Sequence, residues 1–367
     1  MKNYAELLKS FDQQTTTRQE KPKDEVILIS AQDLKPEPIS WLWPNWIAEG
    51  KLHLLAGQPG QGKTTIAISF CATVSAGCTW PDGSPCTAGN VLIWSGEDDV
   101  SDTLLPRLIA AGCESFRCHF IKGVRRSGEV QSFDPARDML ALEQEIDRIG
   151  DVKLLVLDPI VSVVTGDSHS NTEVRRALQS LVDLANRKNF AVLGITHFSK
   201  GSAGVDPMLR VIGSVAFVGV ARSVFVAQKT RDTDGGSQGV FAKAKANSAI
   251  SSGGFAYSIE QVQIVDHIET SRIAWGEELE GSANELLSEV TEAHQEGRSN
   301  ELQEMLRAEL ENGPKSAGEV IQSLQANGYS TNQIKRASIS IAVKKDKQGM
   351  HGGWTWSLPS MPITGIG

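Results

Sequence analysis

The chain has 367 residues, of which 40% are hydrophobic and 22% charged, and its formal net charge is −8 at pH 7. This length allows a large buried core and favours two domains, whereas the acidic balance argues against a protein that coats nucleic acid with its whole surface. The five cysteines are odd in number and form no C-x-x-C pair, which argues against a disulfide framework and a zinc site. Because the start shows no signal-peptide pattern and no apolar run reaches ~20 residues, we expect a cytoplasmic protein without membrane contact.

Residues 1–38 are predicted to form a polar N-terminal arm. Four apolar side chains recur at helical spacing near its start, and a short strand is expected at residues 26–29. The helix could dock on its own domain or on a neighbouring subunit, and the sequence supports both alternatives equally. The four side chains are Tyr4, Leu7, Leu8 and Phe11.

Three tryptophans, Trp41, Trp43 and Trp46, mark the entry into the next domain. Such side chains could stack on nucleic-acid bases, but clustered aromatic residues more often cap the hydrophobic edge of a sheet. We therefore expect them in a hydrophobic core.

One stretch fits the phosphate-binding pattern G-x-x-x-x-G-K-[ST]. A buried strand is expected before it at residues 51–56, and an apolar helix opens after it. The glycines let the backbone turn tightly and aim its N–H groups at phosphate oxygens, while the helix N-terminus adds partial positive charge. We expect Lys63 to reach the β- and γ-phosphates of a nucleotide and the Thr64 hydroxyl to bind Mg²⁺. The expected nucleotide-binding stretch is Gly57, Gln58, Pro59, Gly60, Gln61, Gly62, Lys63, Thr64 and Thr65.

Three further predicted strands end in side chains that could carry chemistry. The strand at 90–95 runs into the acidic cluster Glu97-Asp98-Asp99, the apolar run at 153–158 closes with Asp158, and the strand at 190–197 places His197 at its tip. Ligands of open α/β sheets bind at the carboxyl ends of the strands. Asp158 is therefore expected to point toward Mg²⁺, and its position favours a functional role for His197 over a structural one.

Further strands and helices complete the expected sheet. Arg222 precedes one of these strands, and the loop at 199–212 carries Lys200 and Arg210. Alternating strands and helices followed by strands alone predict an α/β fold with a RecA-like sheet. The remaining expected helices are 100–111, 172–188 and 213–221, and the remaining strands are 119–121, 223–227, 240–246 and 254–259.

The last part of the chain changes character. Residues 277–311 hold eleven Glu against two Arg, which indicates a solvated helical connector. Capping-box patterns at 316–319 and 330–333 open two helices, and a basic hairpin follows. This succession predicts a winged helix-turn-helix. Residues 333–351 hold five Lys or Arg and one Asp, so the module could bind DNA, and a role in protein contacts stays equally open.

Taken together, the motifs from about Trp41 to Glu260 resemble those of the RecA-like P-loop ATPases of the plasmid and phage hexameric replicative-helicase type. Their order and spacing are specific for the ATPase class and less specific for helicase activity, because other ATPases of mobile elements share them. The resemblance covers neither the N-terminal arm nor the C-terminal module. The shared stretches are residues 60–64, 96–99, 155–158, 196–201, 213–222 and 244–247.

The resemblance implies a role for each matching residue. Asp158 would hold Mg²⁺ through water, and Glu97 would be the base that orients the attacking water. His197 would sense the γ-phosphate and relay its state to the following loop. Arg222 would be an arginine finger that reaches into a neighbour's ATP site, with Lys245 a weaker candidate for this task. A finger in trans supplies about 10³–10⁵-fold in rate and makes hydrolysis depend on assembly.

These features predict an ATP-hydrolysing, ring-forming motor with ATP and Mg²⁺ as cofactors, namely a replicative DNA helicase of a plasmid, phage or integrated element. Lys200 and Arg210 would line its central pore. The expected partners are further copies in a hexameric ring, single-stranded DNA, and a primase or replication-initiation protein. The alternative is an ATP-switched DNA-binding regulator or loader without unwinding activity. The expected parts are the arm 1–38, a RecA-like ATPase domain 39–270, an acidic helical connector 271–300, a winged helix-turn-helix domain 301–359 and a tail 360–367.

Overall fold

The structure is a computed structural model that describes residues 26, 28–134, 137–163, 171–198, 215–233, 236–247, 252–347 and 354–359. The helix expected around Tyr4, the loop residues Lys200 and Arg210 and the tail at 360–367 lie outside these residues. The chain divides into two compact units, Met1–Ile39 and Ser40–Gly367. In the first unit, Val26, Leu28 and Ile29 are exposed and form no strand, so the strand expected at 26–29 is not found there.

The second unit is built on one large sheet, which contains nine strands within the described residues. Six strands are parallel, in the order β10-β3-β9-β8-β4-β5, and the sheet continues through β10, β11, β12 and β13 as an antiparallel extension. The strands are β3 (Leu52–Gly57), β4 (Asn90–Ser95), β5 (Cys118–Phe120), β8 (Val152–Asp158), β9 (Ala191–His197), β10 (Ser223–Thr233), β11 (Gly236–Ala246), β12 (Gly254–Gln263) and β13 (Glu269–Leu279).

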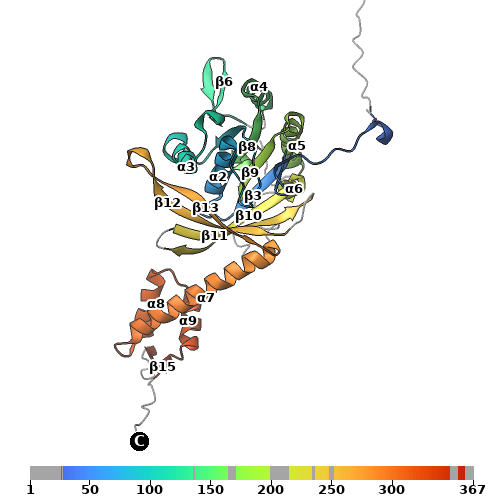
Figure 1. The fold of residues 1–367 in the computed structure, drawn as a ribbon. Helices are drawn as coiled ribbons and strands as arrows, with labels where there is room; N and C mark the ends of the chain where they lie inside the picture. The colour runs from blue at the N-terminus through green and yellow to red at the C-terminus, as the bar shows by residue number, and fades with distance from the viewer. Residues whose placement is uncertain are drawn as a thin grey trace, which may run out of the picture. The chain divides into compact units, whose positions relative to one another are not determined.

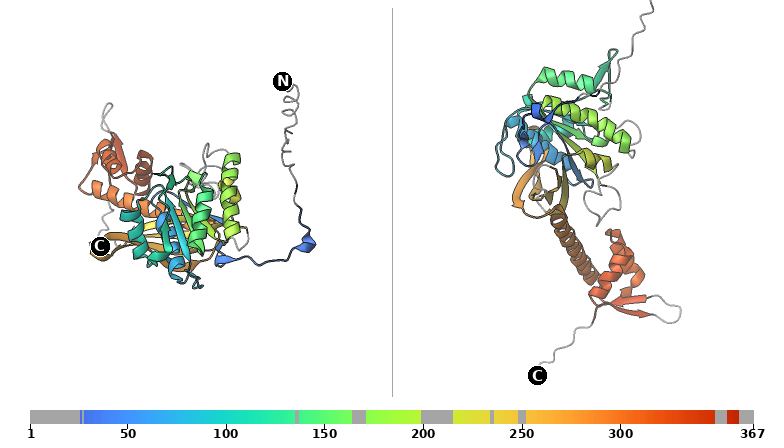
Figure 2. Two further views of the ribbon diagram at one scale, coloured as in Figure 1. Left: turned by 90° about the horizontal axis from the view of Figure 1, so that it is seen from above. Right: turned by 90° about the vertical axis from the view of Figure 1, so that its right-hand side faces the viewer.

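Helices cover both faces of this sheet (Figures 1 and 2). On one face lie α4, α5, α6 and the start of α7, and on the other lie α2 and α3. Before α3, residues Val100–Leu104 form a π-helical turn, so the helix expected at 100–111 is present in two pieces. The helices are α2 (Lys63–Ala76), α3 (Leu105–Ala110), α4 (Met139–Ile149), α5 (Asn171–Lys188), α6 (Val215–Val220) and α7 (Ala283–Leu310).

The two faces bury separate hydrophobic clusters. Along β3, Leu54 and Ala56 belong to the cluster under α4 and α5, whereas Leu55 belongs to the cluster under α2, because successive residues of a strand face opposite sides. Trp43 is fully buried and stacks on Trp46 and on Trp80, with ring centroids 4.8 Å apart in each pair. Of the three tryptophans expected in the core, Trp43 and Trp46 are buried there, whereas Trp41 is partly exposed.

The antiparallel extension contains one strand more than the sequence predicts, namely β13. β13 pairs with β12 along most of its length, although its side chains are exposed or half-exposed and several are charged. The boundary expected at residue 270 therefore falls inside a strand of the sheet, and α7 begins only at Ala283. Its first turn is fixed by a capping box between Ser282 and Glu285 that the sequence analysis does not predict.

The C-terminal part has its own hydrophobic cluster. The end of α7 packs with α8 (Ala317–Ala326) and α9 (Thr331–Ser340) around Leu306 and Ile334, and a small sheet has the order β14-β16-β15. Ser330 and Gln333 form the expected capping box of α9, but Ser316 makes no capping hydrogen bond to α8. The strands are β14 (Lys315–Ser316), β15 (Lys344–Lys347) and β16 (Trp354–Ser357).

All five cysteines are free thiols in the structure. Among the described residues, no helix has both the length and the apolar character that crossing a membrane requires.

His53 on β3 is expected to make the fold sensitive to acid. It is fully buried, its Nε2 lies 2.9 Å from the Ala48 carbonyl, and burial lowers its pKa to about 4. The folded protein binds this proton less readily than the unfolded chain does, so the contribution of His53 to stability is fully present above the unfolded pKa of about 6.5. The free energy of unfolding then falls by up to about 3 kcal/mol as the pH drops from about 6.5 to 4. His53→Gln should flatten the free energy of unfolding over this range, measured by urea denaturation.

The exposed His267, replaced in the same way, is the matched control. An equal pH slope in wild type and His53→Gln would contradict this prediction.

Candidate nucleotide site

The turn between β3 and α2 has the backbone that a phosphate loop requires. β3 ends at Gly57 and α2 begins at Lys63. Gly60 and Gly62 have φ of 78° and 80°, in the left-handed region that side chains disfavour. At Gly57, an added Cβ would lie 2.4 Å from the Ala227 carbonyl oxygen. Glycine is therefore required at these positions by backbone conformation or by close approach of a neighbouring strand.

Lys63 lies at the base of this loop and is almost completely buried. Its Nζ donates to the Gln58 carbonyl at 2.9 Å and lies 3.2 Å from Nδ1 of His197. Burial lowers the pKa of the ammonium group, and the carboxylates of Asp158 and Glu97 oppose this effect. The loop thus holds a cation at the centre of the turn, where it can neutralise phosphate charge.

Thr64 and Asp158 meet beside the loop. The Thr64 hydroxyl donates to Asp158 Oδ2 at 2.7 Å, and the Asp158 side chain is buried. Burial raises the pKa of Asp158 to about 6, the neighbouring Glu97 and Asp98 carboxylates add to this effect, and the Thr64 hydrogen bond opposes it. A buried carboxylate beside a hydroxyl offers hard oxygen ligands, which is the donor set that Mg²⁺ takes beside a nucleotide. These residues therefore fit the expected metal.

His197 connects Lys63 with Glu97. Its Nε2 lies 3.4 Å from Glu97 Oε1, while its Nδ1 faces the lysine. An ammonium group can only donate, so Nδ1 accepts and the proton sits on Nε2, where it is directed at the carboxylate. Half of the Glu97 side chain is exposed, so this carboxylate can also contact a water molecule.

The three neighbouring acidic residues have different surroundings. Asp98 is paired with Arg107 of α3 at 3.0 Å. Asp99 caps the following turn by accepting from the backbone of Ser101 and Asp102, and these hydrogen bonds lower its pKa. Glu97 is the member of the cluster that faces His197, and it is best placed to accept a proton from water.

Apart from Asp99, these side chains share one cavity of ≈ 340 Å³ at the carboxyl edge of the parallel strands. Nine of the residues that are expected in the site line it, six of them from residues 57–65 and the others Glu97, Asp158 and His197. Arg107, Ile259 and Ser271 also line the cavity without having been predicted, because only the folded α3, β12 and β13 bring them there. The lining residues are Pro59, Gly60, Gly62, Lys63, Thr64, Thr65, Glu97, Asp98, Arg107, Asp158, Ile195, His197, Ile259 and Ser271.

Arg222 and Lys245 lie elsewhere in the sheet. The Arg222 backbone N–H donates to the Leu52 carbonyl, so it lies at the start of β3 rather than at the end that carries the loop. The Lys245 ammonium donates to the carbonyls of Val218 and Ala221, at 2.6 and 2.9 Å, and so caps the C-terminal end of α6. Neither residue lines the cavity of its own chain.

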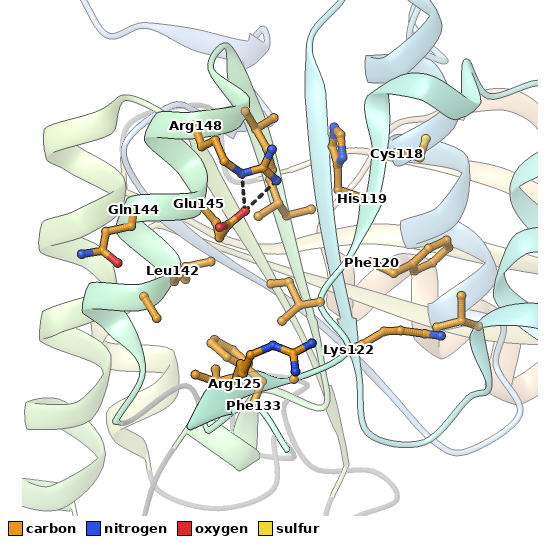
Figure 3. Close-up of a pocket in the computed structure, with 17 residues that line it drawn as sticks. Cys118, His119, Phe120, Lys122, Arg125, Phe133, Leu142, Gln144, Glu145 and Arg148 are labelled. Atoms are coloured by element: carbon orange, nitrogen blue, oxygen red, sulfur yellow. Dashed lines mark hydrogen bonds and ion pairs between the residues drawn. The ribbon is translucent and has the colours of Figure 1, made fainter. Parts of the chain in front are cut away.

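A larger cavity of ≈ 700 Å³ lies between the edge strand β5 and α4 (Figure 3). Apolar side chains such as Phe133 and Leu142 line it, together with Lys122 and Arg125, and Arg148 on its wall is paired with Glu145. It contains none of the residues of the phosphate loop. Volume alone would therefore select a different site from the one that the chemistry indicates.

A family model described as an AAA domain matches residues 16–203 of the chain. The match spans just over half of the 367 residues and includes the phosphate loop, Glu97, Asp158 and His197. No curated protein matches the chain.

Proposed function

The chain belongs to the AAA domain family of P-loop ATPases, and from this premise we propose that it is an ATP-driven, ring-forming motor that acts on DNA. The observation that carries the proposal is the shared cavity of Lys63, Thr64, Glu97, Asp158 and His197. It combines a phosphate cradle, oxygen ligands for a metal and an accessible carboxylate, which are the parts that phosphoryl transfer to water needs.

In the proposed reaction, the N–H groups of the loop and the Lys63 ammonium hold the phosphates. Thr64 and Asp158 would hold Mg²⁺, which would supply further neutralisation of the phosphate charge. Glu97 orients water and accepts its proton. His197, between Lys63 and Glu97, shifts its hydrogen bonds when the γ-phosphate is lost, and relays this change to the segment that follows β9.

We assign the arginine finger to Arg222 of a neighbouring copy. Among the described residues, the cations that line the cavity are Lys63 and Arg107, and the second is engaged by Asp98. Transition-state charge on the phosphate therefore calls for a further cation. Arg222 lies away from the cavity of its own chain, which suits a side chain that acts in trans, and a closed ring of six copies would complete every site.

We infer that the C-terminal part is a winged helix-turn-helix that contacts DNA. The succession of α8, α9 and the β15–β16 hairpin supports this assignment. Lys344, Lys345 and Lys347 are exposed on β15, and Lys335 and Arg336 are exposed on α9. Exposed cations on one small module of an otherwise acidic chain are suited to phosphate contacts.

The finer assignment is a replicative DNA helicase of a plasmid, phage or integrated element, with single-stranded DNA in the ring and a primase or replication-initiation protein as partner. The support is the resemblance in motif order together with the cavity. The alternative is an ATP-switched regulator or loader, which would bind duplex DNA and separate no strands.

Charge reversal of Lys344, Lys345 and Lys347 is expected to weaken binding to duplex DNA and to flatten its salt dependence, because each lost phosphate contact lowers the slope by about one. ATP hydrolysis without DNA should stay at the wild-type rate. The effect is measured by fluorescence anisotropy between 50 and 200 mM salt. Over this range, the affinity of a protein that makes many phosphate contacts changes by roughly 10³-fold.

The control reverses three exposed cations elsewhere, Lys35, Lys122 and Arg125, which changes the net charge equally. Unchanged DNA binding in the β15 variant would favour a module for protein contacts.

Unwinding of a forked duplex by the full-length chain distinguishes the two candidate functions. A helicase separates the strands only with hydrolysable ATP, and its ATPase rate rises with single-stranded DNA. A regulator or loader binds the duplex and leaves it intact under the same conditions, and this result would reject the helicase assignment.

A further inference from the structure

Gln61, in the middle of the phosphate loop, is held by two strands of the antiparallel extension. The Tyr257 hydroxyl on β12 donates to the Gln61 carbonyl oxygen at 2.7 Å. The backbone N–H of Lys229 on β10 donates to Oε1 of the same residue. No motif in the sequence connects residues so distant along the chain, and none of the catalytic roles described above explains the contact.

Tyr257 is itself fixed in place. It is 2% exposed, and its ring lies over Gly239, its partner on β11, where an added Cβ would be 2.4 Å from Cζ. Burial raises the pKa of the Tyr257 hydroxyl, so the group keeps its proton and remains a donor. Two residues further along β12, Ile259 occupies the space beside Gly62, with Cδ1 2.6 Å from the position of an added Cβ. β12 thus contacts the loop at two adjacent positions.

The contact fixes the direction of one phosphate-binding group. In a trans peptide the C=O of one residue and the N–H of the next lie in one plane and point in opposite directions. When the Gln61 oxygen is bonded to Tyr257, the Gly62 N–H points away from Tyr257. Gly62 lines the nucleotide cavity, whereas Tyr257 is not among its lining residues. An N–H on the side of the peptide away from Tyr257 is placed to face the cavity that Gly62 lines.

Such a constraint matters because the loop is intrinsically free to turn. Gly60 and Gly62 flank Gln61 and both have positive φ, and glycine adopts several backbone conformations at similar cost. The Gln61–Gly62 peptide can therefore rotate its N–H out of the cavity unless another group holds it. A binding site gains affinity when its groups are fixed before the ligand arrives.

We propose that Tyr257 is a positioning residue that orients the Gln61–Gly62 peptide for binding of the nucleotide phosphates. The proposal rests on the nucleotide-binding part of the proposed function and deepens it. It makes the antiparallel strands a part of the nucleotide site, although Tyr257 touches no phosphate.

Tyr257→Phe tests the proposal, because it keeps the buried ring and removes only the hydroxyl. In the full-length chain with Mg²⁺, we expect the Kd for ADP and the KM for ATP to rise about fivefold, the usual effect of one hydrogen bond. The kcat at saturating ATP should stay within about twofold of wild type, because Lys63, Glu97 and the metal ligands are unchanged. Gln61→Ala, which removes the bond from Lys229, should weaken ADP binding in the same direction.

Tyr329→Phe in the C-terminal part is the matched control and should leave both constants at their wild-type values. Wild-type ADP affinity in Tyr257→Phe would overturn the proposal, and so would a parallel loss of kcat, affinity and thermal stability, which would indicate a merely structural tyrosine. ADP binding needs neither hydrolysis nor DNA, so failure of the motor assignment leaves this test intact. A wild-type chain that binds no ADP would reject both proposals.

Discussion

Glu97→Gln is expected to lower ATP turnover by about 10²–10⁴-fold, the usual contribution of a general base, while ATP remains bound. Glutamine has nearly the same shape but cannot accept the proton of the attacking water.

Lys63→Ala should abolish hydrolysis and also weaken ATP binding, because it removes the buried ammonium from the phosphate loop. Steady-state hydrolysis and equilibrium binding of a fluorescent ATP analogue separate these two outcomes.

Glu143→Gln is the matched control. Glu143 lies on α4, is paired with Arg187 at 3.0 Å and is not among the residues that line the nucleotide cavity, so its replacement should leave turnover unchanged. Normal turnover in Glu97→Gln would reject its assignment as the base. Asp98, although paired with Arg107, would then be the next carboxylate to test.

Arg222→Ala is expected to lose ATP turnover by about 10³–10⁵-fold while it keeps ATP binding, because a finger in trans stabilises only the transition state. Mixing should then rescue activity. Arg222→Ala subunits keep an intact phosphate loop, and Lys63→Ala subunits keep an intact finger. Some interfaces of a mixed ring therefore combine an intact phosphate loop with an intact arginine finger. Two inactive proteins should together recover part of the wild-type ATPase rate.

Arg272→Ala, which removes an exposed arginine paired with Glu260 on the neighbouring strand, is the control and should keep its turnover. If both variants assemble and exchange subunits but mixing restores nothing, Arg222 does not act in trans. The local alternative, an ion pair that only stabilises the chain, would then be tested by comparing the unfolding of Arg222→Ala with wild type.

The centre of the fold is predictable from the sequence because its strands are buried on both faces. Such strands are continuous apolar runs closed by glycine or charge, and β4 at Asn90–Ser95 has the predicted limits. β13 could not be found in this way. Its charged, partly exposed residues look like a connector, and it becomes a strand only because β12 offers an edge with which it can pair.

The residues of the candidate site also differ in whether the sequence predicts them. Lys63 and Thr64 are recognisable from a local motif, and Glu97, Asp158 and His197 from their places at strand ends, because parallel strands bring those ends to one edge. The contacts of Arg107 with Asp98 and of Tyr257 with Gln61 depend on packing between distant elements. The hydrogen bonds of Lys245 could not be predicted either, because nothing in the neighbouring sequence indicates that its ammonium binds the carbonyls at the end of α6.

Steady-state ATP hydrolysis by the full-length chain, with and without single-stranded DNA, tests the proposed motor most directly. We expect Mg²⁺-dependent hydrolysis that is absent from Lys63→Ala and that rises when single-stranded DNA is added. A rate no higher than that of Lys63→Ala would contradict the assignment of the cavity as an ATPase site. A clear ATPase rate that is indifferent to single-stranded DNA would contradict the motor.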